Sequence, residues 1–241
     1  QGVAISDIRD INVADLLGRH QIDTDLESIA GYLSDKRVLV TGAGGSIGSE
    51  LCRQLSTFEP AELMMLDRDE SALHALQLSM EGTALLESED LIVADIRDAE
   101  RLHEIFERRR PEVVFHAAAL KHLPLLELHP EEGVKSNVWG TRNVLDASVR
   151  AGVERFVNIS TDKAANPTSV LGYTKRVAER FTAHMAAETG LPYLSVRFGN
   201  VLGSRGSVVP AFKAMIERGG PVTVTDPDAT RSMRVIQENA Q

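Results

Sequence analysis

The stretch that decides the fold is Thr41-Gly42-Ala43-Gly44-Gly45-Ser46-Ile47-Gly48. It follows a short apolar run, Arg37–Thr41, that predicts a β-strand, and it leads into a run with helical spacing. In that setting Gly42 permits a tight turn, Gly45 lets the backbone approach a diphosphate, and Gly48 lets the helix pack closely on the strand. The stretch therefore predicts a dinucleotide-binding Rossmann half.

An acidic residue at the end of the second expected strand bears on the choice of dinucleotide. Asp67 stands twenty-five residues after the first glycine of the loop, close to the ~20 typical of the carboxylate that holds the adenosine ribose hydroxyls. This spacing favours NAD over NADP. Arg68 argues the other way, because an arginine at this place is suited to a 2′-phosphate. As an alternative, the acidic segment Asp67–Glu70 caps the next helix.

Further cofactor contacts are expected at the start of the first helix, whose free amides and positive dipole end suit a diphosphate, and at the ends of later strands. Small side chains after the fourth strand would let the cofactor lie against the sheet. Each of these residues alone is also typical of ordinary packing. The residues are Ser46, Ile47, Asp95, Ile96, Ala117, Ala118 and Ala119.

Short apolar runs alternate with longer amphipathic stretches along the chain, which is typical of a parallel sheet covered by helices. We predict an α/β fold, a Rossmann doubly wound parallel sheet with helices on both faces. The expected strands are Arg37–Thr41, Leu63–Leu66, Leu91–Ala94, Val113–His116, Arg155–Ile159 and Tyr193–Arg197. The expected helices lie near 46–57, 69–80, 98–109, 131–151, 172–189 and 208–218.

The pattern divides the chain into three parts. Residues 1–35 form an acidic N-terminal extension or linker, and residues 36–199 form the NAD-binding Rossmann domain. From 200 to 241 a Gly/Ser/Pro loop, a helix and a strand-like Pro221–Thr225 suggest the start of a substrate-binding lobe, which the chain ends before completing.

Composition excludes several classes of function. A formal net charge of −9, without a dense basic run to offset it, argues against nucleic acid as a partner. No apolar run reaches the ~18 residues of a membrane span, and no signal peptide is recognisable. The single cysteine, Cys52, is expected to be a small buried residue, as in a reducing compartment. We expect a cytoplasmic protein without a metal site.

Four later segments carry a specific resemblance. The chain is similar to the extended short-chain dehydrogenase/reductase enzymes and, within them, to the UDP-N-acetylglucosamine 4,6-dehydratases of bacterial polysaccharide and capsule biosynthesis. The similarity runs from about Asp35 to Arg231. The segments are His116-Ala117-Ala118-Ala119-Leu120-Lys121-His122, Ser136-Asn137-Val138-Trp139-Gly140-Thr141, Ser160-Thr161-Asp162-Lys163-Ala164 and Arg197-Phe198-Gly199-Asn200-Val201-Leu202-Gly203-Ser204-Arg205-Gly206-Ser207.

The resemblance implies an NAD-dependent lyase. The sugar C4 hydroxyl is oxidised by hydride transfer to the nicotinamide, water is lost across C5 and C6, and the hydride returns at C6. Larger members of the family carry an N-terminal membrane domain, so this chain, which lacks a membrane segment, would correspond to the cytoplasmic domain of an inner-membrane protein. We also expect a homo-oligomer.

Elimination needs an acid and a base, and two adjacent titratable residues follow the fifth strand. The resemblance implies that Asp162 is the acid, that Lys163 is the base and that Thr161 hydrogen-bonds the C4 oxygen. Burial and a nearby cation such as Lys175 or the nicotinamide must then lower the pKa of Lys163, and Asp162 must stay protonated long enough to donate. The alternative for this tripeptide is a solvated turn.

The chain departs from most short-chain dehydrogenases at the Tyr-x-x-x-Lys pair, because Leu171 stands four residues before Lys175. Tyr173 is no simple replacement, since residues two apart on a helix point to nearly opposite sides. The long membrane-linked dehydratases also lack this tyrosine. The base for C4 stays open between Asp162 and Thr161. Lys175 would hold the nicotinamide ribose, unless it is an ordinary surface lysine, and Asn137 would support the local helix and a water network near the cofactor.

The UDP-sugar substrate calls for donors to a diphosphate and a uracil. Lys121, which also borders the cofactor region, and His122 follow the fourth strand and would line the sugar pocket. A structural role for His122 is the alternative. After Arg231 the chain departs from the family. The expected nucleotide-binding residues are Asn200, Arg205, Ser207, Lys213 and Arg231.

Three functions are therefore weighed. The leading one is an NAD-dependent UDP-N-acetylglucosamine 4,6-dehydratase. A nucleotide-sugar 4-epimerase shares the first oxidation but needs no base for C5. A non-catalytic NAD(P)-binding regulatory domain is the third, because of Leu171 and the incomplete second lobe.

Overall fold

The computed structural model describes residues 31–202, 208–223 and 233–235. These residues fall into two compact units: the larger ends at Phe198, and the smaller begins at Gly199. Among the helices of the described residues, none is both long and apolar enough to cross a membrane.

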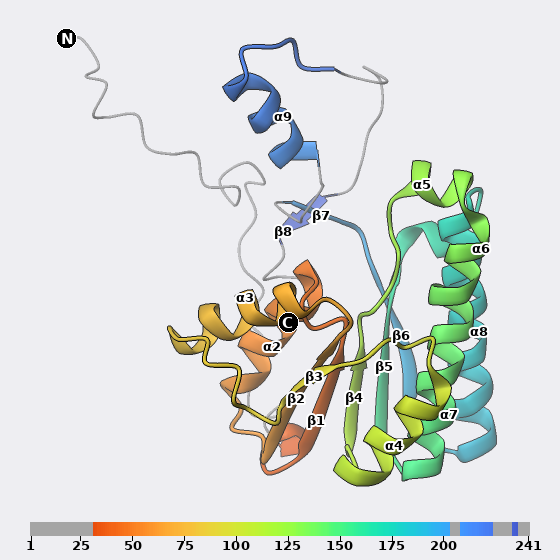
Figure 1. The fold of residues 1–241 in the computed structure, drawn as a ribbon. Coiled ribbons are helices and arrows are strands. Elements are labelled where there is room, and N and C mark those ends of the chain that lie inside the picture. The colour runs from red at the N-terminus through yellow and green to blue at the C-terminus, as the bar shows by residue number, and fades with distance from the viewer. Residues whose placement is uncertain (1–30, 203–207, 224–232, 236–241) are drawn as a thin grey trace. The chain divides into compact units, whose positions relative to one another are not determined.

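The larger unit is built on a parallel sheet of six strands in the order β3-β2-β1-β4-β5-β6 (Figure 1). Strand order reverses between β1 and β4, so the connections that leave these two strands diverge and open a crevice at the carboxyl edge of the sheet. The predicted doubly wound fold is confirmed. The strands are β1 Arg37–Thr41, β2 Glu62–Asp67, β3 Leu91–Val93, β4 Val113–His116, β5 Arg155–Thr161 and β6 Tyr193–Phe198.

Helices cover both faces of this sheet, and the side chains of β1 alternate between the two cores. Leu39 packs against α4 and α7, whereas Val38 and Val40 pack against α2 and α3. Figure 1 shows the same division, with α2 and α3 on one side and α4, α7 and α8 on the other. The helices are α2 Ser46–Ser56, α3 Glu70–Glu81, α4 Ala99–Arg109, α5 Leu123–Leu128, α6 Pro130–Gly133, α7 Thr141–Ala151 and α8 Val170–Thr189.

The helix expected over 131–151 is not one regular helix. Between α6 and α7 lies a π-helical segment, η3, at Val134–Gly140. Its wider turns change which residues face inward, and π-helical segments are frequent at functional sites. The sequence pattern could not separate α6, η3 and α7, because the spacing of their apolar residues is that of a single continuous helix. Helix α5 was not predicted from the sequence, because its six residues are too few to show a period.

The smaller unit contains a pair of parallel strands, β7 Asn200–Leu202 and β8 Met233–Val235, and the helix α9 Val208–Glu217. Neither strand was predicted. The strand-like segment expected at Pro221–Thr225 is wrong for 221–223, which form no strand, and the rest of it lies outside the described residues.

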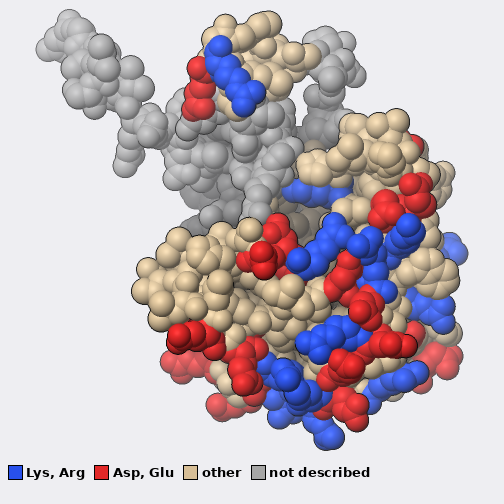
Figure 2. Space-filling view, in the orientation of Figure 1, with Lys and Arg blue, Asp and Glu red and all other residues tan. Residues whose placement is uncertain are grey.

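Charged side chains of both signs are interspersed over the visible face of the larger unit (Figure 2). Many of them are paired: Arg109 contacts Glu62 at 3.1 Å, and Arg97 contacts Glu132 at 3.1 Å.

The single cysteine, Cys52, is fully buried, and burial raises the pKa of its thiol to about 12. The prediction of a small buried residue at this position is confirmed.

The end of β1 makes a very close contact with the chain that follows β4. Gly42 has φ +69°, and a Cβ added to it would lie 2.6 Å from the Cα of Ala118. A Cβ on Gly48 would lie 2.1 Å from the carbonyl oxygen of Gly42, so α2 also packs directly on the loop. Both contacts require the absence of a side chain.

Gly42→Ala is therefore expected to destabilise the protein more than a backbone strain alone would. Gly152→Ala is the matched control, because Gly152 has φ +74° but nothing within 4 Å of its added Cβ. The control substitution should lower the free energy of unfolding by about 1–2 kcal/mol, and Gly42→Ala by a further ~1–3 kcal/mol for overpacking. Urea denaturation measures both. Equal losses would show that the loop gives way without cost.

Candidate functional site

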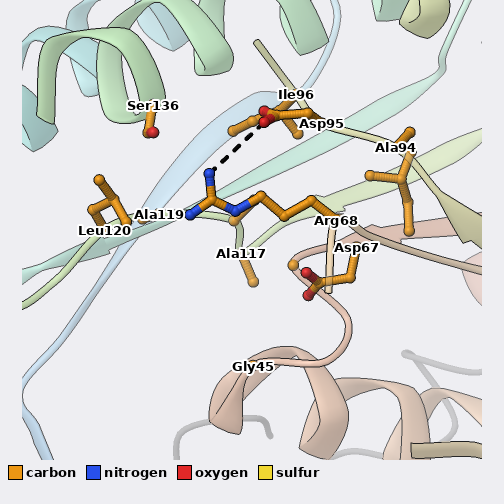
Figure 3. A pocket seen from close by; sticks show the side chains of 13 residues that line it. Gly45, Asp67, Arg68, Ala94, Asp95, Ile96, Ala117, Ala119, Leu120 and Ser136 are labelled. Atoms are coloured by element: carbon orange, nitrogen blue, oxygen red, sulfur yellow. Dashed lines mark ion pairs between the residues drawn. The ribbon is translucent and has the colours of Figure 1, made fainter. Parts of the chain in front are cut away.

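A pocket lies at the carboxyl edge of the sheet, where β1 and β4 diverge (Figure 3). The glycine-rich segment Gly42–Gly48, called the phosphate loop below, forms one wall. The ends of β2 and β3 form another, and the segment after β4 forms the third. The lining residues are Gly42, Gly45, Leu66, Asp67, Arg68, Ala94, Asp95, Ile96, Ala117, Ala118, Ala119, Leu120 and Ser136.

The amino end of α2 differs from those of α3, α4 and α8. α3, α4 and α8 begin with side-chain caps from Asp69, Asp98 and Ser169. α2 begins after Gly45 without a side-chain cap and without an acid in its first turn. The positive end of its dipole thus meets the pocket that Gly45 lines, which suits an anionic group such as a diphosphate.

Asp67 is held rigidly at the pocket. Its Oδ2 accepts a hydrogen bond from the backbone N–H of Gly44 at 2.9 Å, and its Oδ1 accepts one from the N–H of Asp69 at 3.0 Å. Each carboxylate oxygen keeps a second lone pair, so the group retains acceptor capacity for a ribose diol. The alternative of helix capping applies to Asp69, which caps α3 through Ala72, and not to Asp67.

Arg68 extends across the pocket towards Asp95, as Figure 3 shows, with 3.7 Å between Nη1 and Oδ2. Asp95 is bound more tightly by Arg97, at 2.7 Å. Burial disfavours the charged form of Asp95, but the hydrogen bonds from the side chain and backbone of Arg97 outweigh it and lower the pKa of the carboxyl. Both carboxylates of the pocket therefore have fixed partners.

These features fit a dinucleotide. The loop borders the pocket with two glycines, Gly42 and Gly45, so that no side chain stands between its backbone and a ligand. The wall after β4 begins with three alanines, and the carboxylate of Asp67 stands at the end of β2. The expected residues Gly42, Gly45, Asp67, Arg68, Asp95, Ile96, Ala117, Ala118 and Ala119 are brought together here, while Ser46, Ile47 and Gly48 begin the adjoining helix.

Four lining residues were not singled out from the sequence. Leu66 and Ala94 stand at or just after strand ends, Leu120 follows the alanine wall, and Ser136 belongs to η3. Leu120 and Ser136 belong to two of the segments that carry the family resemblance, so this resemblance could have identified them as lining residues. Leu66 and Ala94 carry no distinguishing chemistry, so packing alone reveals them.

Asn137 does not line the pocket but supports its wall. The residue is fully buried; its Oδ1 accepts the N–H of Leu120 at 2.8 Å, and its Nδ2 donates to the Leu120 carbonyl at 3.0 Å. Nδ2 also donates to Oγ1 of Thr174 on α8 at 3.1 Å. Asn137 thereby ties the pocket wall to α8.

Thr161, Asp162 and Lys163 form one hydrogen-bonded group at the carboxyl end of β5. Thr161 Oγ1 donates to Asp162 Oδ1 at 2.9 Å, and Lys163 Nζ lies 3.0 Å from the same oxygen. Burial raises the pKa of Asp162, but the hydrogen bonds from Lys163 and Thr161 outweigh it, and the net pKa is lowered. Asp162 is therefore a carboxylate in the chain without substrate, and it must take up a proton before it can act as the expected acid.

Lys175 lies inside α8 with 5% of its surface exposed, whereas Tyr173 is 58% exposed. The two residues face opposite ways, as helical spacing predicts, so Tyr173 is peripheral and Lys175 is no surface lysine. Burial lowers the pKa of Lys175 to about 8, against an opposing effect of Glu179. Leu171, on the same face as Lys175, is also buried.

Glu179 connects α8 to the two last strands of the sheet. It accepts a hydrogen bond from Ser160 Oγ at 2.6 Å and two from Arg197, at 2.7 and 2.8 Å. Burial disfavours its charge, but these partners prevail and lower the pKa of its carboxyl. The helix that carries Lys175 is thus anchored directly beside the residue that precedes Thr161.

The expected substrate residues are placed unevenly. Lys121 and His122 are exposed beyond the pocket wall, and Asn200 belongs to β7 of the smaller unit. Lys213 belongs to α9, but its side chain lies outside the described residues. Arg205, Ser207 and Arg231 also lie outside them.

His116, at the end of β4, is fully buried and bonded on both ring nitrogens. Nδ1 lies 2.7 Å from Thr41 Oγ1, and Nε2 lies 2.9 Å from Thr141 Oγ1. Burial, with a smaller effect of the charge on Lys175, lowers the pKa of His116 to about 3. The imidazole is therefore neutral at physiological pH.

Comparison with known proteins agrees with this geometry. Residues 38–241 match the family described as polysaccharide biosynthesis protein. The chain is 47% identical over 235 residues to the probable polysaccharide biosynthesis protein EpsC of Bacillus subtilis, covering 96% of this chain and 39% of EpsC. It is 37% identical over 201 residues to a UDP-N-acetylglucosamine 4,6-dehydratase (inverting) of Campylobacter jejuni, covering 81% of this chain and 58% of the relative.

Two solved structures share the fold. Pen from Bacillus thuringiensis superposes with a TM-score of 0.78 at 33% identity, over 87% of this chain and 64% of Pen. A UDP-glucose 4-epimerase from Stenotrophomonas maltophila, with bound NAD and formylated UDP-arabinopyranose, gives 0.71 at 26% identity, over 85% of this chain and 71% of the epimerase. The chain thus spans less than two thirds of EpsC, the dehydratase and Pen.

Lys175→Met is expected to stabilise the folded chain, because at pH 7 the buried ammonium is charged at a cost that methionine avoids. A pKa lowered from 10.5 to about 8 corresponds to up to about 3 kcal/mol, so the free energy of unfolding should rise by about 1–3 kcal/mol. The gain should shrink as the pH rises above 8, because the folded state then loses the charge. Lys135→Met, at an exposed lysine, serves as the control in urea titrations. A loss of stability would show that Lys175 has a compensating partner.

His116→Gln is expected to flatten the acid dependence of stability. Below pH 6.5 the unfolded chain binds a proton that folded His116, with a pKa of about 3, does not bind, so lowering the pH favours unfolding. Between pH 7 and pH 5 the wild type should lose about 2 kcal/mol more than the variant. His74→Gln, at an exposed histidine of α3, should behave as wild type. Parallel curves for all three proteins would contradict a neutral buried imidazole.

Proposed function

The chain belongs to the polysaccharide biosynthesis protein family, and from this we propose that it is an NAD-dependent nucleotide-sugar 4,6-dehydratase that converts UDP-N-acetylglucosamine to a UDP-4-keto-6-deoxy sugar. The observation that carries the proposal is the hydrogen-bonded group Thr161, Asp162 and Lys163 at the carboxyl end of β5. The names of the similar proteins, a 4,6-dehydratase and an epimerase with bound NAD, support the same class of chemistry.

The pocket supports NAD as the cofactor. The glycine loop and the start of α2 would hold the diphosphate, Asp67 the adenosine ribose, and the alanines after β4 the flat face of the molecule. A bound nicotinamide supplies reversible oxidation at the sugar C4. Arg68 lies 3.7 Å from Asp95 with about half of its side chain exposed, so it stays available to a 2′-phosphate, and it is the carboxylate of Asp67 that favours NAD over NADP.

Asp162 can begin the chemistry that Leu171 cannot. The carboxylate accepts a hydrogen bond from Thr161 Oγ1 at 2.9 Å. With the C4 hydroxyl donating to Thr161, the proton released on oxidation passes through that hydroxyl to Asp162. Asp162 is then a carboxylic acid placed beside the sugar, as an acid for the C6 hydroxyl must be.

Lys163 completes the elimination. After Lys163 has released its ammonium proton to solvent, its amine takes the C5 proton, made acidic by the C4 ketone, while protonated Asp162 gives its proton to the departing C6 hydroxyl, which leaves as water. Lys163 later returns a proton to C5. Every proton taken from the sugar is thus returned to the sugar or leaves as water, and Asp162 ends as the carboxylate it was at the start.

Incubation of the protein with NAD and UDP-N-acetylglucosamine should yield a UDP-4-keto-6-deoxy sugar, identified by mass spectrometry as loss of one water and by NMR as a C6 methyl group. Lys163→Ala should lower turnover by at least about a hundredfold, as loss of a general base does. Lys36→Ala, at the opposite edge of the sheet, should retain turnover within about twofold.

Recovery of UDP-N-acetylgalactosamine would replace the dehydratase with a 4-epimerase, which needs no C5 base. Binding of NAD without any sugar product would point to the non-catalytic regulatory domain.

A further inference from the structure

The larger unit contains a series of buried hydrogen bonds, which ends at the main-chain carbonyl of Asn137 and resumes at the side chain of that residue, and which the proposed chemistry does not use. It starts at Thr41, the last residue of β1, passes through His116 to Thr141 at the start of α7, and continues to the carbonyl of Asn137, 2.8 Å from Thr141 Oγ1. From Asn137 Nδ2 it goes on to Thr174 Oγ1 of α8 at 3.1 Å. The exposed surface of each of these residues is 5% or less.

The chain of bonds has one direction, which fixes the position of the proton on His116. The single hydroxyl proton of Thr141 is donated to the Asn137 carbonyl. Thr141 Oγ1 must therefore accept from His116, which places a proton on Nε2. Nδ1 is then an acceptor, and the Thr41 hydroxyl donates to it. A neutral imidazole with the proton on Nε2 satisfies all these groups, and each of them is too deeply buried to be satisfied by bulk water.

This chain of bonds reaches three parts of the candidate site, two at its ends and one through the side chain of Asn137. Thr41 is followed directly by Gly42 of the phosphate loop. Asn137 holds both the N–H and the carbonyl of Leu120, which lines the pocket. Thr174 precedes Lys175, and its own hydroxyl donates to the carbonyl of Leu171 at 3.0 Å.

We propose that His116 is a positioning residue: through the Nε2 hydrogen bond to Thr141 it holds Asn137, and with it the Leu120 wall of the pocket and the Lys175 helix, in one fixed arrangement, while Nδ1 joins this arrangement to the end of β1. His116 itself lies behind the pocket wall and touches neither cofactor nor sugar. Buried hydrogen bonds in series are directional and strengthen one another. An error in position of about 1 Å at a reacting centre can cost about a hundredfold in rate. The effect on turnover rests on the proposed function, whereas the effect on Leu120 does not.

Two substitutions separate the two bonds of the imidazole. The amide of Gln reaches the place of Nε2, so His116→Gln keeps the donor to Thr141 and loses the acceptor for Thr41. The shorter amide of Asn reaches the place of Nδ1, so His116→Asn keeps the partner of Thr41 and loses the donor to Thr141. The Thr141 bond supports Asn137, so His116→Asn should loosen the Leu120 wall and His116→Gln should not.

Hydrogen–deuterium exchange of the peptide that contains Leu120 gives a readout independent of activity. His116→Asn should exchange the Leu120 amide at least about tenfold faster than wild type, and His116→Gln should stay within about twofold. Under saturating NAD and UDP-N-acetylglucosamine, kcat should fall about tenfold in His116→Asn and less than about threefold in His116→Gln, with KM nearly unchanged in both. Equal exchange and equal kcat in the two variants, after correction for the folded fraction, would overturn the proposal.

A second pair keeps the proposal testable if neither His116 variant folds. Thr141→Val removes the hydroxyl at nearly constant shape, and Thr141→Ser restores it. The valine variant should show the fast Leu120 exchange and the serine variant the slow one; slow exchange in both would overturn the proposal. If wild type makes no sugar product, the proposed function fails, and the exchange of Leu120 still decides on His116.

Discussion

The close approach of the backbone after β1 to the backbone after β4 is the constraint on which the rest of the larger unit depends. At Gly42 there is no room for a Cβ against Ala118, and the register pairs Thr41 with His116 one step further into the sheet. Because the segments after β1 and β4 meet there and then diverge, the crevice opens next to this contact. The glycine loop, the alanine wall and the buried imidazole are therefore consequences of one local geometry.

Polar groups inside this unit follow a consistent division of roles. His116, Asn137, Thr141 and Thr174 are buried and mutually satisfied, so they hold the structure in place. Lys175 is buried, and burial lowers its pKa to about 8, which is costly to folding and typical of a functional site. The group Asp162 and Lys163, to which we assign the proposed elimination, is partly exposed at the strand end. The polar groups that hold the structure thus lie behind the pocket wall, and those to which we assign the proposed chemistry lie at the edge of the sheet.

Local sequence predicted what local geometry determines. The glycine loop, the ends of β1 and β4, and the carboxylate of Asp67 could be read from residue type and spacing, since each depends on a few neighbouring residues. The π-helical η3 and the role of Asn137 could not, because they depend on contacts with Leu120 and α8 that are distant in the sequence. The ionised state of Asp162 in the chain without substrate could not be predicted either, because it depends on the exact approach of Lys163 and Thr161. For Arg205, Ser207 and Arg231 the sequence prediction still stands alone.

The most direct test of the account follows one hydrogen atom. UDP-N-acetylglucosamine carrying deuterium at C4 is incubated with the protein and NAD, and the product is examined by NMR. A dehydratase that oxidises C4, eliminates water and completes the reaction on the same molecule must place the deuterium in the new C6 methyl group. Deuterium retained at C4 of UDP-N-acetylgalactosamine would show an epimerase instead, and unchanged substrate would contradict catalysis at this site.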